Sequence, residues 1–472
     1  MDTIRTNVSK ISGFPEFLPN VQIAMVRAMD LIRDTYESFG FLPIETPAVE
    51  RAETLLSKGV SEKEVYGLRR MSAQEGENPD KDLALRFDLT VPLARYVAEH
   101  EHDLTFPFRR YQIQPVWRGE RAQKGRFRQF YQCDIDVIGK DQLSLNNDAE
   151  IPVIIFQIFR RMGIGPFTIG VSNRKVLEAL LRHAGLDDVS IGPAFAALDD
   201  LHKKGAEATR ARLLECGIGE RAVDELMTYV SKDFNSGDVI GRLKQMKINA
   251  LFEEGVKELE YVVRTAPLHL PITRESLATP NALEMRDAFA ASFRIDLSVI
   301  RGLDYYTGTI YETTLDNYPG VGSICSGGRY ANLASLFTKT KLPGVGISIG
   351  LTRLASQLIE AGVLKAETST VAQVLVTVQV PEEYQGYVAI ANRLRVGDAN
   401  GSIPAELYNE SAPLKKQLTY AERKGFPVVI VANSEELSRD RVRVKNMKFR
   451  QEQEVTIPQL VSFVRQLLPE IP

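Results

Sequence analysis

The chain has 472 residues, of which 44% are hydrophobic and 25% are charged, and its formal net charge is −3. This length predicts more than one domain, and the composition is that of an ordinary soluble globular protein. The three cysteines form no CxxC pair, which argues against a zinc knuckle or a disulfide framework. No apolar run of about 18 residues occurs, so we expect no membrane association and a cytoplasmic location.

The N-terminal part predicts a helix followed by extended segments. Apolar residues recur at helical spacing through 21–39, and Gly40 is placed to end that helix. The segment 41–50, FLPIETPAVE, contains two prolines, which confine it to a sheet edge or an interface. Residues 83–99, LALRFDLTVPLARYVAE, begin as a strand and become a helix after Pro92.

The segment Arg109–Gly139 predicts a β-hairpin around a basic loop. Seven of the residues from Arg109 to Arg128 are basic, and only Glu120 is acidic. Period-2 alternation on both sides of the loop places one set of side chains on a single face: Arg118, Glu120, Phe130, Gln132 and Asp136. Such alternation is typical of a solvated sheet face. Arginines, a stackable ring and carboxylates on one face also suit a site for an anion, a base and an amine.

The second half of the chain predicts an insertion and a separate C-terminal unit. From about 186 to 270, dense charge and helically spaced apolar residues indicate a helical insertion. Strand-like sequence returns at 293–308, and 342–354 leads into another helix. After a polar linker near 367–370, strands alternate with helices to the end, which predicts a small α/β domain with a mixed sheet.

Several common catalytic motifs are absent from the sequence. No phosphate-binding P-loop, strand–GxGxxG–helix unit, HExxH or GxSxG occurs, and the five histidines show no metal-binding spacing. What remains is four clusters rich in arginine, aromatic and acidic residues: 88–90, the hairpin, Arg301–Tyr306 and Arg353. Transition states of phosphoryl or nucleotidyl transfer need positioned positive charge, which guanidinium groups supply. The sequence therefore predicts a site in which a bound carboxylate attacks a nucleoside triphosphate.

These clusters resemble the motifs of class II aminoacyl-tRNA synthetases. FLPIETPAVE, VWRGERAQKGRFRQF and GVGISIGLTRL resemble motifs 1, 2 and 3. RGLDYYTG (Arg301–Gly308) and SGGRY (Ser326–Tyr330) are similar to the two signatures of the histidyl-tRNA synthetase family. LRFDLTVPLARY and FYQCDIDVIG resemble its variant in eukaryotes and some bacteria, and LKKQLTYAERKGFPVVIV resembles an anticodon-binding domain.

The resemblance implies an α+β fold with an antiparallel-sheet catalytic domain, a helical insertion and a C-terminal α/β anticodon-binding domain. The expected boundaries are 1–185 and 276–366 for the catalytic domain, 186–275 for the insertion and 371–472 for the anticodon-binding domain. It also implies a homodimer that joins L-histidine to the 3′ end of histidine tRNA, with ATP as substrate together with Mg²⁺ and no metal bound by protein side chains. The loop Arg121–Gly125 would then guide the tRNA acceptor end.

The resemblance also implies a role for each site residue. The residues expected at ATP are Arg118 at the α-phosphate, Glu120 positioning the nucleotide, Phe130 stacking on adenine, and Arg126 and Arg353 at the outer phosphates. Those expected at histidine are Asp88, Thr90 and Gln132 at the α-amino group, Asp136 and Tyr306 at the imidazole, and Tyr305 and Tyr330 closing the pocket. Arg301 is expected between the histidine carboxylate and the α-phosphate, and with Arg118 it forms the catalytic pair.

Alternative interpretations remain at the level of single residues and of the whole chain. Tyr305 and Tyr306 also suit an ordinary core, and Arg353 also suits the surface of a helix. The basic residues of the C-terminal unit suit either tRNA contacts or a solvated helix face: Lys415, Lys416, Arg423 and Lys424. For the chain, the alternatives are a class II enzyme for proline or threonine and the non-catalytic, synthetase-like regulatory subunit of ATP phosphoribosyltransferase. The retained arginines and the C-terminal unit argue against the regulatory subunit.

Overall fold

The computed structural model describes residues 8–56, 64–70, 83–121, 125–273, 276, 279–301, 306–331, 334–335 and 337–468. These residues form two compact units. The first comprises the described parts of Met1–Pro15 and Ala28–Val363, and the second those of Glu16–Arg27 and Leu364–Pro472. None of the helices in the described part of the chain is both long and apolar enough to cross a lipid bilayer.

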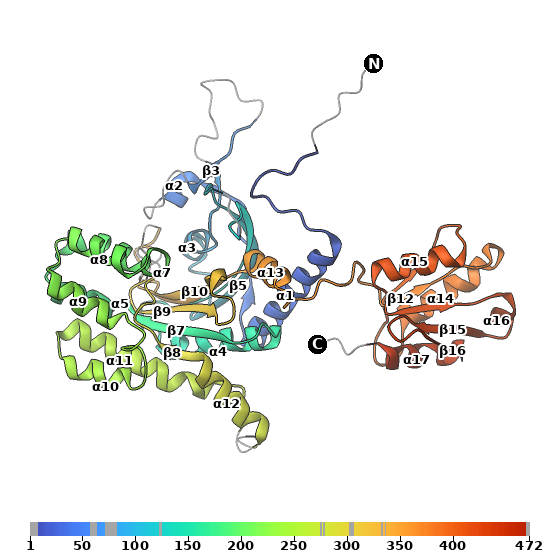
Figure 1. Ribbon diagram of the computed structural model, residues 1–472. Coiled ribbons are helices and arrows are strands. Elements are labelled where there is room, and N and C mark those ends of the chain that lie inside the picture. Colours follow the sequence, from blue (N-terminus) through green and yellow to red (C-terminus); the bar gives the residue numbers. More distant parts are fainter. Residues whose placement is uncertain are drawn as a thin grey trace. The chain divides into compact units, whose positions relative to one another are not determined.

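An eight-stranded sheet forms the centre of the first unit, with strand order β1-β5-β6-β11-β10-β9-β7-β8 (Figure 1). Neighbouring strands pair antiparallel from β5 through β6, β11, β10 and β9 to β7. The outermost pairs, β1–β5 and β7–β8, are parallel. The strands are β1 Leu42–Pro43, β5 Phe108–Trp117, β6 Gln129–Ile138, β7 Phe167–Asn173, β8 Phe293–Ile295, β9 Thr309–Leu315, β10 Ser323–Tyr330 and β11 Gly344–Gly350. This antiparallel-rich sheet confirms the fold class expected from the sequence.

The hairpin of β5 and β6 follows the predicted alternation. Its register pairs Gln112 with Asp134 and Arg110 with Asp136, so even-numbered side chains share one face of the sheet. Odd-numbered residues of β6 point to the opposite face, where Cys133, Ile135 and Val137 are completely buried. On that face the Tyr36 hydroxyl of α1 (Pro19–Ser38) donates to the Cys133 carbonyl at 3.0 Å. The polar face of the hairpin is thereby left for the site.

A small sheet with order β2-β4-β3 precedes the hairpin in the chain. Its strands and neighbouring helices are β2 Val49–Arg51, α2 Ala52–Leu56, β3 Tyr66–Gly67, β4 Leu83–Leu85 and α3 Thr90–Glu99. Arg86 follows β4, is 1% exposed, and donates to the carbonyls of Pro115 at 3.0 Å and Pro47 at 3.2 Å. These bonds hold the end of β4, and so residues 88–90, against β5. α3 begins two residues before Pro92, slightly earlier than predicted.

Two further helices of the first unit flank the sheet strands. α4 spans Asn146–Met162 and packs on β7, β10 and β11, and it ends at Gly163, whose φ of 66° lies in the left-handed region. α13 spans Leu351–Glu360 and directly continues β11, so Arg353 lies just beyond the end of that central strand.

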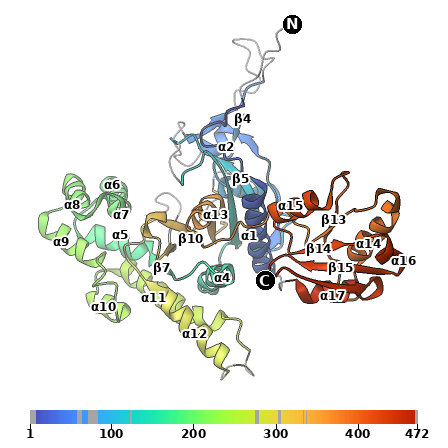
Figure 2. The same ribbon diagram turned by 45° about the vertical axis from the view of Figure 1, so that its right-hand side comes forward.

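The described part of the predicted insertion consists of helices joined by turns. It continues from α5 (Arg174–His183) and comprises α6 Asp188–Asp199, α7 Leu201–Lys204, α8 Ala206–Glu215, α9 Glu220–Tyr229, α10 Val239–Met246, α11 Ala250–Thr265 and the 3₁₀ turn η2 Ala266–His269. α12 (Pro280–Ser292) then leads back to β8. Two views of the ribbon show these helices grouped beside β7, on the side of the sheet that ends at β8 (Figures 1 and 2).

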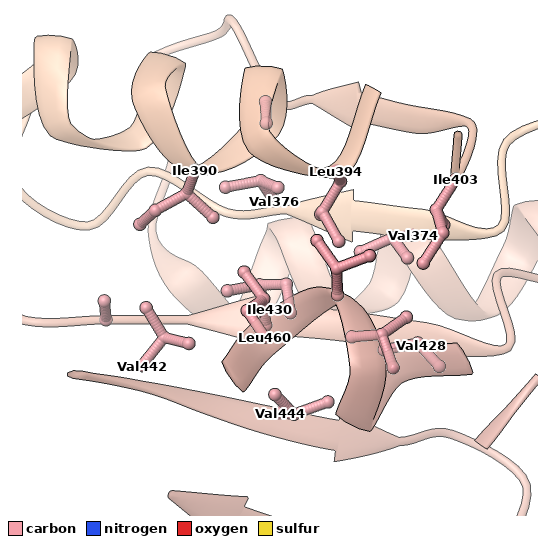
Figure 3. Close-up of a cluster of buried hydrophobic side chains, with 14 of the residues drawn as sticks. Val374, Val376, Ile390, Leu394, Ile403, Val428, Ile430, Val442, Val444 and Leu460 are labelled. Atoms are coloured by element: carbon pink, nitrogen blue, oxygen red, sulfur yellow. The ribbon is translucent and has the colours of Figure 1, made fainter. Parts of the chain in front are cut away.

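The second unit contains a mixed five-stranded sheet with order β13-β12-β14-β15-β16. Its elements are β12 Val374–Val376, α14 Tyr384–Val396, β13 Ala405–Leu407, α15 Leu414–Lys424, β14 Val428–Val431, α16 Ser434–Ser438, β15 Arg441–Asn446, β16 Gln451–Thr456 and α17 Leu460–Leu467. Figure 3 shows side chains of α14 and α17 meeting those of the sheet, among them Ile390, Leu460 and Ile430, each at most 1% exposed. The predicted α/β domain is therefore present. Its last strand, β16, was not predicted.

Candidate active site

The polar face of the central sheet borders a cavity of about 330 Å³. Strands β6, β10 and β11, helix α13 and the segments around the hairpin loop supply its walls. The residues that line it are Arg118, Glu120, Gly125, Arg126, Phe127, Phe130, Gln132, Arg301, Ser323, Ile324, Cys325, Ser326, Ser348, Gly350, Arg353 and Leu354. Residues far apart in the chain thus meet at one place, and every residue expected at ATP lies in this wall.

Three guanidinium groups concentrate positive charge at this cavity. The pKa of Arg353 is lowered, first because the side chain is partly buried and then because Arg126 and Arg301 are positively charged neighbours. Arg353 also donates through Nη2 to the carbonyl of Val321, while its Nε has no hydrogen-bond partner among the described residues. Mutual repulsion of this kind is relieved by an anion, so the cluster suits phosphate groups.

Arg118 and Phe130 lie next to one another on the hairpin. The Arg118 guanidinium carbon is 5.1 Å from the centre of the Phe130 ring, and its Nε donates to the Phe87 carbonyl at 3.1 Å. The backbone bond from Arg118 to Arg128, at 2.8 Å, continues the hairpin pairing beyond the strand ends. The guanidinium thus lies over the aromatic ring at the cavity, and this pair suits the phosphate and the base of a nucleotide.

Arg301 is held by two carboxylates. Glu312, on β9, accepts from Nε at 2.8 Å and pairs with Nη2 at 2.6 Å. Asp199, at the end of α6, lies 3.5 Å from Nη1. Burial lowers the pKa of Arg301, but the charges of Glu312 and Asp199 outweigh this effect and the net shift is upward. Arg301 therefore stays charged.

A cluster of buried carboxylates continues the site along β6. Asp136 is 4% exposed; its Oδ1 accepts from the Tyr330 hydroxyl at 3.0 Å, and its Oδ2 pairs with Arg110. Burial raises the pKa of Asp136 to about 6, against the opposing charge of Arg110. Burial likewise raises the pKa of Asp134 to about 7, and the charges of Asp136 and Asp88 add to that effect.

Glycines on β10 and β11 make room for the larger side chains of this cluster. A side chain at Gly346 would collide with Asp136, and one at Gly344 would collide with the Tyr330 ring. A Cβ at Gly328 would lie 2.9 Å from the Tyr306 ring. Burial, followed by the negative charges of Asp136 and Asp134, raises the pKa of Tyr306, so this phenol remains a hydrogen-bond donor.

Gln132 joins the carboxylate cluster to the cavity. Its Nε2 donates to the Ser348 hydroxyl at 2.7 Å, and the Asp134 carboxylate is also hydrogen-bonded to Ser348. The Gln132 Oε1 is buried and has no hydrogen-bond partner among the described residues. Such a buried acceptor suits a hydrogen bond from a donor group of a ligand.

The structure brings most of the predicted histidine-site residues together. Asp88, Gln132, Asp136, Tyr306 and Tyr330 occupy one region, and Arg353 lines the cavity instead of lying on an outer helix surface. Thr90 is half-buried at the first turn of α3, two residues after Asp88, whose Oδ1 accepts from the Val91 amide at 3.1 Å. Tyr305 and residues 122–124 of the predicted guide loop lie outside the described residues.

Three neighbours of the site were not predicted from the sequence. Arg110 shares the even parity of Arg118, so extending the alternation by a few residues would have found it. Glu312 is the one acidic residue within the strand TIYETTL. Ser348 carries no comparable signal, because a serine in a strand is common.

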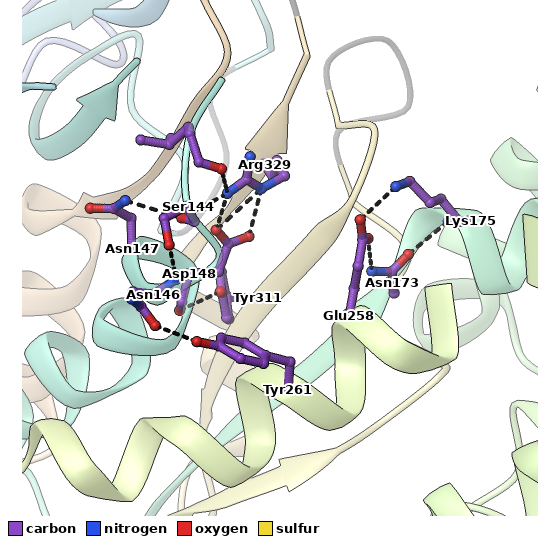
Figure 4. Close-up of polar contacts among 11 residues, drawn as sticks. Ser144, Asn146, Asn147, Asp148, Asn173, Lys175, Glu258, Tyr261, Tyr311 and Arg329 are labelled. Carbon is purple, nitrogen blue, oxygen red and sulfur yellow. Dashed lines mark hydrogen bonds and ion pairs between the residues drawn. The ribbon is translucent and has the colours of Figure 1, made fainter. Parts of the chain in front are cut away.

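The second histidine-type signature also contains a structural ion pair. Arg329, on β10, makes three bonds of 2.5–3.1 Å to the fully buried Asp148 of α4, as Figure 4 shows. The Tyr311 hydroxyl donates to the Asp148 carbonyl at 2.7 Å in the same group. Side chains alternate along β10, so Arg329 ties the sheet to α4 while Tyr330 faces the site.

Comparison with known proteins identifies the family. A family model described as histidyl-tRNA synthetase matches residues 13–354, and one described as an anticodon binding domain matches residues 373–467. A histidine–tRNA ligase of Clostridium tetani is 43% identical over 461 residues, covering 97% of this chain and 98% of that protein. A histidyl-tRNA synthetase structure from Nostoc sp. PCC 7120 has a TM-score of 0.85 and 38% identity, with 98% of this chain and 100% of that chain covered.

A more distant structure bears on the regulatory-subunit alternative. It is described as an ATP phosphoribosyltransferase regulatory subunit/histidyl-tRNA synthetase from Bacillus halodurans, with a TM-score of 0.68 and 18% identity over 88% of this chain and 97% of that chain. At that identity the likeness concerns the fold alone. The full-length relatives therefore favour a ligase over the regulatory subunit, and the chain belongs to the histidyl-tRNA synthetase family.

Proposed function

We propose that this chain activates L-histidine with ATP and then transfers the histidyl group to the 3′ end of histidine tRNA. One observation carries the proposal: β6 runs from the arginine-lined cavity, at Gln132, to Asp136, a buried acceptor that Tyr330 and Arg110 hold from two sides. An anion site beside an acceptor for an imidazole N–H is what joining histidine to an adenylate requires.

ATP would occupy the cavity. Arg118 binds the α-phosphate, Phe130 stacks on adenine and Glu120 positions the nucleotide. Arg126 and Arg353 contact the outer phosphates, in keeping with the repulsion between their guanidinium groups. Mg²⁺ belongs in this proposal to the nucleotide substrate, because phosphate oxygens and water are its usual ligands.

Histidine would lie between the cavity and the carboxylate cluster. Its α-ammonium group is bound by Asp88, by Thr90 and by the Oε1 of Gln132, for which the described part of the chain offers no hydrogen-bond partner. Asp136 and Tyr306 bond the two imidazole nitrogens, while Tyr305 and Tyr330 close the pocket. An amino acid of similar size without these nitrogens leaves buried polar groups unpaired, which disfavours it strongly.

Arg301 would act on the reacting atoms. A histidine carboxylate oxygen attacks the α-phosphorus, the bond from that phosphorus to the β-bridging oxygen breaks, and pyrophosphate leaves. Arg301 and Arg118 bind the charge that accumulates on the α-phosphate oxygens. In the second step a terminal ribose hydroxyl of tRNA attacks the histidyl carbonyl carbon, and AMP leaves with the electrons of the carbon–oxygen bond.

We also propose that the chain binds tRNA and forms a homodimer. The loop Arg121–Gly125 guides the tRNA acceptor end, and the second unit, which matches an anticodon-binding model, binds the anticodon. A homodimer forms through the segment after α1, in which Leu42 is 58% and Val49 37% exposed. The free cysteines suit the reducing cytoplasm. We also propose the domain ranges expected from the sequence, 1–185 with 276–366, 186–275 and 371–472.

Charging of tRNA tests the proposed function. Purified protein, ATP, Mg²⁺ and total tRNA are incubated with labelled histidine, proline or threonine, and acid-precipitable label is counted. The proposal expects label from histidine alone. Label from proline or threonine, or from none of the three, contradicts it, and the last result returns attention to the regulatory-subunit alternative.

A further inference from the structure

One contact links the helical insertion to the proposed catalytic arginine. Asp199 is the last residue of α6, and its Oδ1 lies 3.5 Å from Nη1 of Arg301. The two side chains are 21% and 32% exposed, so the pair is partly withdrawn from water. Asp199 is separated from Arg301 by about a hundred residues of chain that include the rest of the insertion.

The carboxylate of Asp199 does not stabilise its own helix through the helix dipole. The C-terminal end of a helix carries partial negative charge, so a carboxylate there is unfavourable unless a cation compensates it. The next residue, Asp200, is compensated within the insertion, by Lys204 at 2.8 Å and Arg212 at 2.7 Å. Asp199 pairs with Arg301, which lies in the segment between β8 and β9.

Packing of α6 fixes the position from which Asp199 reaches Arg301. Phe195 lies one helical turn earlier and therefore on the same face of α6. It is completely buried, and the guanidinium carbon of Arg174, which follows β7, lies 3.3 Å from its ring centre. The end of α6 is thereby anchored beside the sheet that carries Glu312.

Asp199 and Glu312 hold different nitrogens of one guanidinium group. Glu312 engages Nε and Nη2, and Asp199 faces Nη1. A planar group held at two edges cannot rotate about its bond to the side chain without losing one of its partners. We propose that Asp199 is a positioning residue that orients Arg301 for adenylate formation, an inference that rests on the proposed function and couples the insertion to the chemical step.

The matched substitutions Asp199→Asn and Asp200→Asn test this inference. Both remove one charge from adjacent residues at the end of α6 and keep the side-chain size. ATP–pyrophosphate exchange gives kcat and the KM values for histidine and ATP, and thermal unfolding reports stability. We expect Asp199→Asn to lower kcat about tenfold and to keep both KM values within about twofold of wild type. A misplaced catalytic group slows the chemical step more than it weakens substrate binding. Asp200→Asn should keep the wild-type kcat.

A double-substitution cycle separates positioning from general damage. If Asp199 acts through Arg301, adding Asp199→Asn to Arg301→Lys should change kcat less than about twofold further. Wild-type kcat in Asp199→Asn, an equal loss in Asp200→Asn, or full additivity with Arg301→Lys would each overturn the inference while leaving the proposed function intact. Wild-type protein without histidine-dependent exchange would refute the proposed function itself.

Discussion

Replacing Arg110 by methionine removes one of the two groups that hold Asp136. Arg110 is fully buried and pairs with Oδ2 of Asp136, whereas Tyr330 donates to Oδ1. Methionine fills much of the same apolar volume without the charge. In the variant, Asp136 therefore stays buried, keeps a single donor and loses its compensating cation.

The expected effect follows from the pKa of Asp136. That pKa is about 6 with Arg110 present, because burial raises it and the guanidinium opposes the rise. Without Arg110 the pKa of Asp136 rises further. Each pKa unit above the pH of the assay lowers the ionised fraction of Asp136 about tenfold, which corresponds to about 1.4 kcal/mol. Breaking a buried pair typically costs about 3–5 kcal/mol, and protonation of Asp136 relieves part of this. We expect the KM for histidine at pH 7 to rise about ten- to a hundredfold.

Pyrophosphate exchange measured from pH 7 to pH 9 tests this prediction. The ratio of variant to wild-type KM cancels the titration of free histidine, and it should fall as pH rises because Asp136 regains its charge. Arg109→Met is the matched control, since Arg109 is adjacent but pairs with Glu150 at 2.6 Å, away from the site. A ratio near one at pH 7, a ratio independent of pH, or the same rise in Arg109→Met would refute the reasoning.

Four further predictions concern the same structure. Arg301→Ala should still bind ATP in equilibrium dialysis but lose about 3–4 kcal/mol of transition-state stabilisation in exchange; near-wild-type exchange would exclude Arg301 from catalysis. The pKa of Asp134 is raised from 3.8 to about 7, so the folded state binds this proton more tightly and stability falls as pH rises through that range. Asp134→Asn should therefore gain more urea resistance over wild type at pH 8 than at pH 5, as followed by Trp117 fluorescence; the same difference at both pH values would contradict this. Arg329→Met removes the cation that pairs with Asp148 and should cost about 3 kcal/mol of unfolding free energy by the same measurement, whereas an unchanged midpoint would show that the pair adds no stability. Charging should weaken with salt more steeply than exchange, because only charging involves tRNA phosphates, and equal slopes would count against those contacts.

The strand pairing at the site could be predicted because its pattern is local. Along β6 the alternation of Gln132 and Asp136 with Cys133 and Ile135 determines which side chains share a face, and the structure confirms it. The second unit was predicted for the same reason, since its buried strands are short apolar runs. Strand β16, QEQEVT, was missed because four of its residues are exposed and it carries almost no apolar signal.

The partners of the site residues could not be read from local patterns. The sheet places β11 between β6 and β10, and β9 beside β10, so contacts join residues far apart in the chain. Arg301 thus meets Glu312 and Asp199, and Arg329 meets Asp148, through packing that no periodicity encodes. The resemblance to a family supplied the roles of Arg301 and Arg353, but not the side chains that hold them.

ATP–pyrophosphate exchange with each of the twenty amino acids, in wild-type protein and in Asp136→Asn, measures which amino acid this sheet face selects. We expect histidine alone to drive exchange in the wild type. In Asp136→Asn, the KM for histidine should rise while the KM for ATP is kept. Exchange driven by another amino acid, or an Asp136→Asn variant with the wild-type KM for histidine, would contradict the assignment of this sheet face to histidine activation.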